Sequence, residues 1–119
     1  MNQEIAMRKR CSSLEDKIGH QEIKHDRKVS NIASRLEDYG YKVETHLEYY
    51  DVNSGKVLGE VDILAFDKYG VMNIEVKTNN GSMFKGYEQL DRFKSYFPQV
   101  SVINSLLITK RGVYRVRGV

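Results

Sequence analysis

Two short segments of the chain, Gly59-Glu60-Val61-Asp62-Ile63-Leu64 and Ile74-Glu75-Val76-Lys77-Thr78, decide how its central part folds. Apolar and charged residues alternate in both, which is the period-2 pattern of a strand with one face against a core. Between them lies Asp67-Lys68-Tyr69-Gly70, whose residues favour a tight reversal. We therefore expect an antiparallel hairpin of two strands, over 57–66 and 71–78.

The register of this hairpin decides whether its charged side chains meet. A turn of two or four residues makes every facing pair on one side apolar. These pairs are Val61 with Val76, Ile63 with Ile74, and Ala65 with Met72. On the other side Asp62 comes opposite Glu75. Glu60 comes opposite Lys77 there, so one face is predicted to be core and the other a cluster of charges.

The charged cluster has the composition of a metal site. Carboxylates within roughly 5 Å of each other repel, and a bound cation or a lysine relieves that repulsion. We expect Mg²⁺ or Mn²⁺ on Asp62, Glu75 and the backbone carbonyl of Val76, since these are hard oxygen ligands. If such a metal site hydrolyses a phosphodiester bond, Lys77 would orient or deprotonate the water that attacks phosphorus and would offset the negative charge that develops there. A solvated salt-bridge face is the alternative for each residue taken singly.

The segments around the hairpin predict a mixed α/β fold. A helix over 25–39 is indicated by Val29, Ile32, Ala33 and Leu36 at helical spacing, with Gly40 ending it. A strand over 41–50 follows, then the hairpin and a second helix over 83–97 that Pro98 stops. A buried strand through 106–108 and a short final strand over 113–116 complete the order. The second helix is a crossover that allows one parallel strand pair.

The D…E-x-K pattern of Asp62, Glu75 and Lys77, on adjacent strands between two helices, resembles the signature of the PD-(D/E)XK nuclease superfamily. That superfamily includes archaeal Holliday junction resolvases and RecB-like or Cas4-like nucleases, and the resemblance covers about residues 25–110. It implies a restriction-endonuclease-like αβββαβ core, a mixed sheet flanked by helices. It also implies that Asp62 and Glu75 ligate the metal and that Lys77 is catalytic. The proline that often precedes the first acid is replaced by Val61.

Downstream, Gln89-Leu90-Asp91-Arg92-Phe93 is similar to the Q-x-x-x-Y element of RecB-like nucleases. The resemblance implies that Gln89 touches substrate or holds Lys77, so Gln89 joins the expected catalytic residues. An exposed helical amide is the alternative explanation for Gln89.

The acid that many resolvases carry on the first helix would fall near Val29, where no carboxylate stands. If Gly55 takes the left-handed position of a three-residue loop, Leu47 pairs with Val61 and Glu48 lies beside Glu60. We therefore rank Glu48 first as the third acid and metal ligand. Glu60 comes next, followed by Glu22 or Asp26. The same register places His46 beside Asp62, where we expect a bystander rather than a ligand.

Charge is distributed unevenly along the 119 residues, whose net charge is +3. Residues 1–60 hold ten Lys/Arg against eleven Asp/Glu, and residues 61–119 hold nine against five. The basic second half predicts a phosphate-binding surface. We expect nucleic-acid contacts from Lys85, Arg92, Lys110, Arg111 and Arg115. A basic edge strand kept soluble by its charges is the alternative.

We expect one nuclease-like domain over 23–119, preceded by a helical extension over 1–22 with Ser12 or Ser13 as its cap. The lone Cys11, the short apolar stretches and a charged start without a secretory signal favour an intracellular, cytoplasmic protein without a membrane span.

The expected activity is hydrolysis of DNA phosphodiester bonds by a metal-dependent deoxyribonuclease. The resemblance favours a homodimeric endonuclease specific for Holliday junctions or other branched DNA in recombination and repair. The alternatives are a RecB-like exonuclease, a non-catalytic nucleic-acid-binding module on the same scaffold, and a partner-binding protein that uses residues 1–22.

Overall fold

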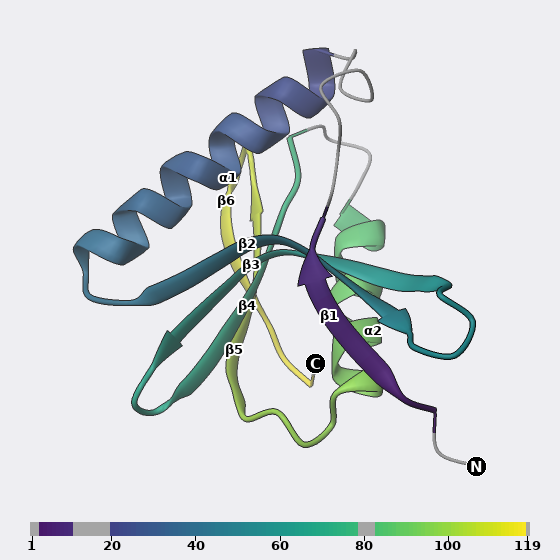
Figure 1. Cartoon of the computed structure of the whole chain (residues 1–119). Coiled ribbons are helices and arrows are strands. Elements are labelled where there is room, and N and C mark those ends of the chain that lie inside the picture. Colours follow the sequence, from purple (N-terminus) through teal and green to yellow (C-terminus); the bar gives the residue numbers. More distant parts are fainter. Residues whose placement is uncertain (1–2, 11–19, 79–82, 119) are drawn as a thin grey trace.

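The computed structural model of the chain describes residues 3–10, 20–78 and 83–118 and has a mixed α/β fold (Figure 1). Two helices and six strands follow one another in the order βαβββαββ. They are β1 (Ile5–Lys9), α1 (His20–Asp38), β2 (Lys42–Asp51), β3 (Val57–Asp67), β4 (Gly70–Val76), α2 (Met83–Tyr96), β5 (Val102–Thr109) and β6 (Gly112–Val116). From α1 onward this is the order that the sequence predicts. Gly40 follows α1 with φ of 97°, the left-handed conformation expected at a helix end.

The first strand corrects an expectation. The sequence predicts a helical extension over residues 1–22, but Ile5–Lys9 is a strand, β1, that pairs antiparallel with β2. Ile5 and Met7 are partly buried against the core beneath them, and the exposed edge of β2 offers unpaired backbone groups. The helical prediction is therefore wrong for these residues. Cys11, Ser12 and Ser13 lie outside the described residues.

The strands form one sheet in the order β1-β2-β3-β4-β5-β6. All neighbours are antiparallel except β4 and β5, which are parallel because α2 crosses over between them. The expected hairpin register is confirmed from the turn to Ile63, since Ile63 pairs with Ile74 and Ala65 with Met72. The expected pairs of Val61 with Val76 and of Glu60 with Lys77 are not formed, because β3 and β4 separate beyond Ile63, and Val61 packs in a different cluster from Val76.

The register expected between β2 and β3 is confirmed as well, because Leu47 pairs with Val61 and Glu48 with Glu60. Gly55 is left-handed, with φ of 74°. The loop differs from the expected one. Asp51 N–H donates to Lys56 O, which encloses residues 52–55, four rather than three, and a register shift between Tyr49 and Tyr50 compensates for the extra residue.

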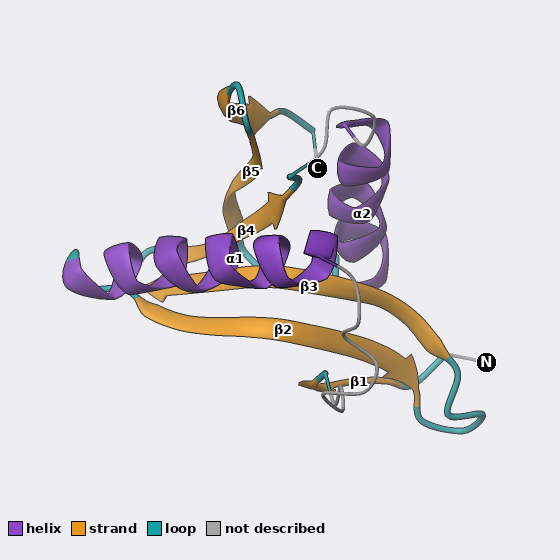
Figure 2. Cartoon of the chain, turned by 90° about the horizontal axis from the view of Figure 1, so that it is seen from above, coloured by secondary structure: helices purple, strands orange, loops and turns teal. Residues whose placement is uncertain are grey.

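The two helices pack against different faces of a strongly twisted sheet, in which β1, β2 and β3 sweep away from β4, β5 and β6 (Figures 1 and 2). Each helix covers its own apolar cluster. Val29 of α1 packs with Ile63, Ile74 and Val76. Under α2, the cluster consists of Leu47, Tyr49, Val61, Leu64 and Phe93.

The second cluster corrects the expectation of a wholly charged face. Leu64 and Phe66 alternate in step with Asp62 along β3, yet Leu64 is buried and Phe66 is partly buried in the cluster under α2. Asn73 on β4 is also buried. The predicted charged cluster of Glu60, Asp62, Glu75 and Lys77 is therefore confined to the end of the hairpin where β3 and β4 separate.

Gly59 makes the close approach of β3 to the Tyr49 ring possible. A Cβ at position 59 would overlap the Tyr49 ring, whose ring carbons lie at 2.4 and 3.0 Å. The ring cannot move aside, because Phe93, Tyr96 and Phe97 pack around it with centroid distances of 6.2, 5.7 and 5.3 Å. Gly59 is thus required for packing rather than for a turn.

Gly59→Ala should lower the free energy of unfolding by about 1–3 kcal/mol, the usual cost of overpacking a core. Urea unfolding followed by circular dichroism measures the change. The exposed neighbour Lys56→Ala is the control and should change stability little. In a Tyr49→Ala background the cost of Gly59→Ala should fall towards zero, and an unchanged cost would contradict the packing explanation.

Candidate metal and catalytic site

The site is built where β3 and β4 diverge. Beyond the pair Ile63 and Ile74, Asp62 turns its carboxylate towards β4, and Oδ2 accepts a hydrogen bond of 2.8 Å from Val76 N–H. The Asp62 and Glu75 carboxyls also share a hydrogen bond. Asp62 is 6% exposed and Glu75 is 2% exposed. The structure therefore brings the two predicted acids together and buries both.

Burial and the charge of Asp62 raise the pKa of Glu75 well above its usual value. Burial acts in the same direction on Asp62, but hydrogen bonds from His25, Glu75 and Val76 outweigh it and lower the pKa of Asp62. These opposite shifts favour a state in which Asp62 is ionised and Glu75 is protonated, so that Glu75 donates a hydrogen bond to the Asp62 carboxylate. The pair shares one negative charge where two carboxylates in water would carry two.

His25 of α1 reaches the same point from the other side of the site. Its Nε2 lies 2.9 Å from Val76 O and 3.2 Å from Asp62 Oδ2. Because a carbonyl oxygen only accepts hydrogen bonds, Nε2 carries a proton shared between these oxygens. The hydrogen bond to Asp62 raises the pKa of His25, although burial opposes it. The imidazole thus stands between the two oxygens expected to bind a cation.

A second layer of polar residues holds His25. Asp26 Oδ1 lies 3.4 Å from His25 Nδ1, 3.6 Å from Arg10 Nη2 and 3.8 Å from His46 Nδ1. Arg10 Nη1 also lies 3.6 Å from Glu60 Oε2. These contacts connect the end of β1 with α1, β2 and β3, so several elements fix the ring of His25.

His46 is part of this layer and has a left-handed backbone, with φ of 52°. Such a conformation is uncommon for a non-glycine residue and is found most often near functional sites. Burial lowers the pKa of His46. His46 contacts Asp26 rather than the acid pair.

Lys77 follows the end of β4. Its Nζ lies 3.9 Å from Glu75 Oε1, and its backbone N–H donates to Ile108 O at 2.8 Å. Gln89 reaches inward from α2, and its Oε1 is buried with no hydrogen-bond partner among the described residues. Within that same part of the chain no hydrogen bond joins Gln89 to Lys77. Gln89 is therefore not the freely exposed amide of the alternative explanation.

The candidates for a third acid do not join the pair. Glu48, ranked first, turns to β1, where its Oε1 accepts a hydrogen bond of 2.7 Å from Arg8 Nε. Glu60 faces Arg10. The side chain of Glu22 lies outside the described part, and Asp26 binds His25 instead. Val29, where the resemblance places a helix acid, is fully buried in the core under α1.

Sequence reasoning missed His25 and Arg10. A signal for His25 was present, because it lies one turn before Val29 on the apolar stripe of α1 and so must face the sheet. No local pattern points to Arg10, whose partners Asp26 and Glu60 are far away in the sequence.

The expected nucleic-acid-binding residues are all exposed. Lys85 and Arg92 lie on one face of α2 together with Gln89, since they are spaced by four and three residues. Lys110 and Arg111 form the turn after β5. This turn lies at the end of the sheet where the backbone N–H of Lys77 donates a hydrogen bond to Ile108 O. Arg115 lies apart from them, on β6 opposite Leu106.

Among the described residues, no three His, Cys, Asp or Glu side chains are arranged as a metal-binding group. The donor set here is instead two carboxyls, the Val76 carbonyl and His25, with the imidazole hydrogen-bonded to two of these groups.

Comparison with known proteins identifies a similar fold. No model of a known family matches the chain, and no curated protein does. A solved structure described as "Crystal Structure of Protein of Unknown Function AF1548" matches with a TM-score of 0.52 and 19% identity, over 71% of this chain and 46% of that one. The chain thus spans less than half the length of that protein, and the likeness concerns the fold alone. No helix in the described part is long and apolar enough to cross a membrane.

Glu75→Gln should stabilise the metal-free protein, because it removes a buried acid that is held next to Asp62. The pKa of Glu75 is higher in the folded state than in the unfolded state. The contribution of Glu75 to the free energy of unfolding is therefore fully present below its unfolded pKa and is lost as the pH rises towards its folded pKa. The gain from Glu75→Gln should therefore grow between pH 5 and pH 8, at about 1.4 kcal/mol per pKa unit.

Urea unfolding in EDTA at both pH values measures this gain. The exposed acid Glu88 provides the control, since Glu88→Gln should change stability little at either pH. A Glu75→Gln protein less stable than the wild type at pH 8 would show that the burial of Glu75 and its repulsion by Asp62 do not dominate the effect of this residue on stability.

Proposed function

We propose that the chain is a metal-dependent nuclease that hydrolyses phosphodiester bonds in DNA. The observation that carries the proposal is the buried Asp62 and Glu75 pair, with the Val76 carbonyl and Lys77 beside it, at the point where β3 and β4 diverge. Buried carboxyls cost free energy and do not pack a core, so their retention favours a site that binds and reacts. The same arrangement supports a restriction-endonuclease-like core.

The residues present suit a hard divalent cation. The opposite pKa shifts of Asp62 and Glu75 indicate that a proton reduces the repulsion between the two carboxyls, and a divalent cation bound to both would offset the full charge of the pair. Asp62, Glu75 and the Val76 carbonyl would hold Mg²⁺ or Mn²⁺ through oxygen. His25 stands between these oxygens, so a bound cation either recruits the imidazole or displaces it.

The cation would supply charge stabilisation at the phosphate. The chain's own residues do the rest. Lys77, held 3.9 Å from Glu75, orients the attacking water and offers a proton donor near the phosphate. The buried amide oxygen of Gln89 is free to accept a hydrogen bond from substrate or water. Lys85, Arg92, Lys110 and Arg111 position the backbone through its phosphates.

DNA with a branch is the first substrate to consider, as the resemblance implies. The basic residues near the site lie on a helix and a turn, and Lys and Arg side chains contact phosphate oxygens more often than base edges. Such a surface recognises the course of a backbone and not its sequence. A homodimer would present two such sites to a substrate with two-fold symmetry.

Two alternatives are affected by specific observations. A non-catalytic nucleic-acid-binding module is favoured by His25, which already satisfies Asp62 and Val76 without a cation. For a RecB-like exonuclease, Phe93 stands at the aromatic position of the Q-x-x-x-Y element, but it is 1% exposed and packs on Tyr49. In this chain that aromatic residue belongs to the core and not to a substrate surface.

The wild-type protein with Mg²⁺ or Mn²⁺ should cleave at least one of linear, flapped and four-way DNA. Asp62→Ala and Lys77→Ala should each reduce the rate by about 10²-fold or more, because each removes a charge used at the reacting phosphate. Lys68→Ala, an exposed lysine in the turn between β3 and β4, is the matched control and should keep the wild-type rate. The nuclease proposal fails if the wild type leaves all three substrates intact.

Divalent cations should raise the melting temperature of the protein, since a ligand that binds only the folded state stabilises it. Asp62→Ala should abolish this rise. If His25 is recruited as a ligand, Mn²⁺ should stabilise more than Mg²⁺, because a transition ion accepts imidazole more readily. His25→Ala should then remove the difference between the two ions. Equal stabilisation by both ions in the wild type would mean that the cation displaces His25.

A further inference from the structure

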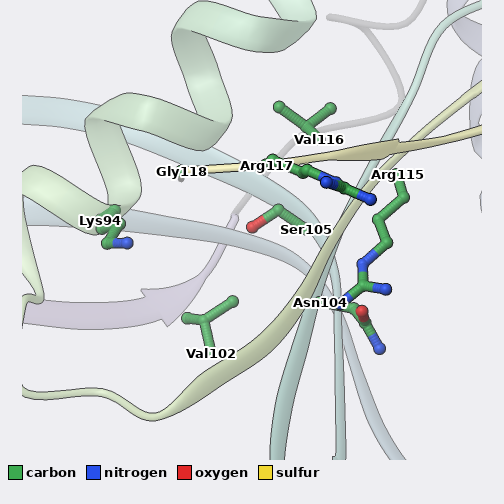
Figure 3. Close-up of a pocket in the computed structure, with 8 residues that line it drawn as sticks. All are labelled: Lys94, Val102, Asn104, Ser105, Arg115, Val116, Arg117 and Gly118. Carbon is green, nitrogen blue, oxygen red and sulfur yellow. The ribbon is translucent and has the colours of Figure 1, made fainter.

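A hollow lies between the last turns of α2 and the edge strand β6, away from the acid pair. It has a volume of about 260 Å³. Figure 3 shows Lys94 on one side of it, Arg115 on the other and Ser105 between them. The full lining consists of Lys94, Val102, Asn104, Ser105, Arg115, Val116, Arg117 and Gly118.

The charges of this hollow have one sign. Lys94, Arg115 and Arg117 line it, and none of the described Asp or Glu residues does. Within the described part of the chain none of the three forms a salt bridge with a carboxylate. Cations gathered from α2 and from the end of β6 repel one another, and an anion between them would remove that repulsion.

The uncharged groups of the hollow narrow the kind of anion. Ser105 is 2% exposed and Asn104 is partly exposed, so a hydroxyl and an amide contribute to the polar lining of the hollow. Hydroxyl and amide groups commonly hydrogen-bond to phosphate oxygens, and the planar guanidinium of arginine pairs with phosphate through two parallel N–H bonds. Together they match a tetrahedral phosphate better than a single carboxylate.

The position of the hollow relates it to the acid pair. On β5, Ser105 pairs with Asn73 and Leu107 pairs with Glu75, so Ser105 and Glu75 lie on the same sheet face. Arg115 pairs with Leu106, so it borders the hollow from the opposite face at the edge of the sheet. Two residues separate the two levels, which is about 7 Å along the strands. A nucleic-acid backbone, with roughly 3.4 Å between successive nucleotides of one strand, covers that length within a few nucleotides.

We propose that the hollow lined by Lys94, Arg115 and Arg117 is a phosphate subsite that holds the nucleic-acid backbone a few nucleotides away from the bond that is cut. This rests on the proposed function for the identity of the substrate. The subsite itself requires only the phosphate group, so its occupancy does not depend on cleavage or on the metal.

The test is binding of the full chain to fluorescent single-stranded and duplex oligonucleotides in EDTA, followed by anisotropy. Arg115→Ala with Arg117→Ala should weaken binding about tenfold or more, since charge-assisted hydrogen bonds are removed. Arg115→Lys with Arg117→Lys keeps the charge but not the bidentate geometry of arginine. The affinity of this variant should lie between those of the wild type and the alanine double variant. Arg35→Ala with Lys42→Ala removes the same charge from α1 and β2 and should bind nearly as the wild type.

The salt dependence of binding gives a second readout. In the Arg115 and Arg117 alanine double variant, the slope of log affinity against log salt concentration should fall by about 0.7 to 0.9 for each phosphate that the variant no longer neutralises. A drop in affinity in the alanine double variant that the Arg35 and Lys42 control matches would overturn the subsite, because it would reflect net charge alone. Unchanged binding in the alanine double variant would overturn it as well.

Titrations with inorganic phosphate and with a mononucleotide test whether the hollow binds a nucleic-acid backbone or any small phosphate compound. Either compound should shift the backbone amide NMR signals of Ser105 and Gly118 weakly, and an oligonucleotide should shift them at far lower concentration. Tight binding of a mononucleotide with no advantage for the oligonucleotide would overturn the nucleic-acid assignment. If oligonucleotide binding depends on the subsite but no DNA is cut with metal, the subsite stands and the nuclease proposal fails.

Discussion

The hydrogen bond from Val76 N–H to Asp62 Oδ2 is the interaction on which the rest of the site depends. It forms where β3 separates from β4, so the Asp62 side chain, rather than a backbone carbonyl of β3, accepts the hydrogen bond from Val76 N–H. The Val76 carbonyl accepts a hydrogen bond from His25, and the Asp62 carboxyl lies next to Glu75. Two acids and one carbonyl meet because the sheet divides at that residue.

Such a site is unfavourable for folding, and its surroundings show how the cost is reduced. The raised pKa of Glu75 favours its protonated form, and His25 Nε2 lies within hydrogen-bond distance of Asp62 Oδ2 and Val76 O. Arg10 forms salt bridges with Asp26 and Glu60. The described part of the chain thus surrounds a buried acid pair with proton donors and a cation. These donors occupy the same atoms that would ligate a metal, which is the pattern expected of a binding site rather than of a stabilising core.

Opposite charges flank α2. The acid pair lies near its first turns, and the hollow of Lys94, Arg115 and Arg117 lies near its last turns. Gly86 lets the helix sit directly on Leu107, which pairs with Glu75, because a Cβ there would lie 2.6 Å from a Leu107 methyl. The helix is therefore held at a fixed level relative to both regions, so the separation between them is set by the core.

The sequence by itself determined the elements from α1 onward, the hairpin register near the turn and the meeting of Asp62 with Glu75, because alternating apolar residues permit only one pairing with a buried face. It also indicated Lys77 and the Val76 carbonyl, which follow from that register. Only the tertiary structure decided the partners that come from elsewhere. His25 lies 37 positions from Asp62, and Glu48 turns to Arg8 on a strand that the sequence did not predict. Which side chains enter the site depends on the twist that separates β3 from β4 and on where α1 and β1 cross it, and no local pattern encodes that geometry.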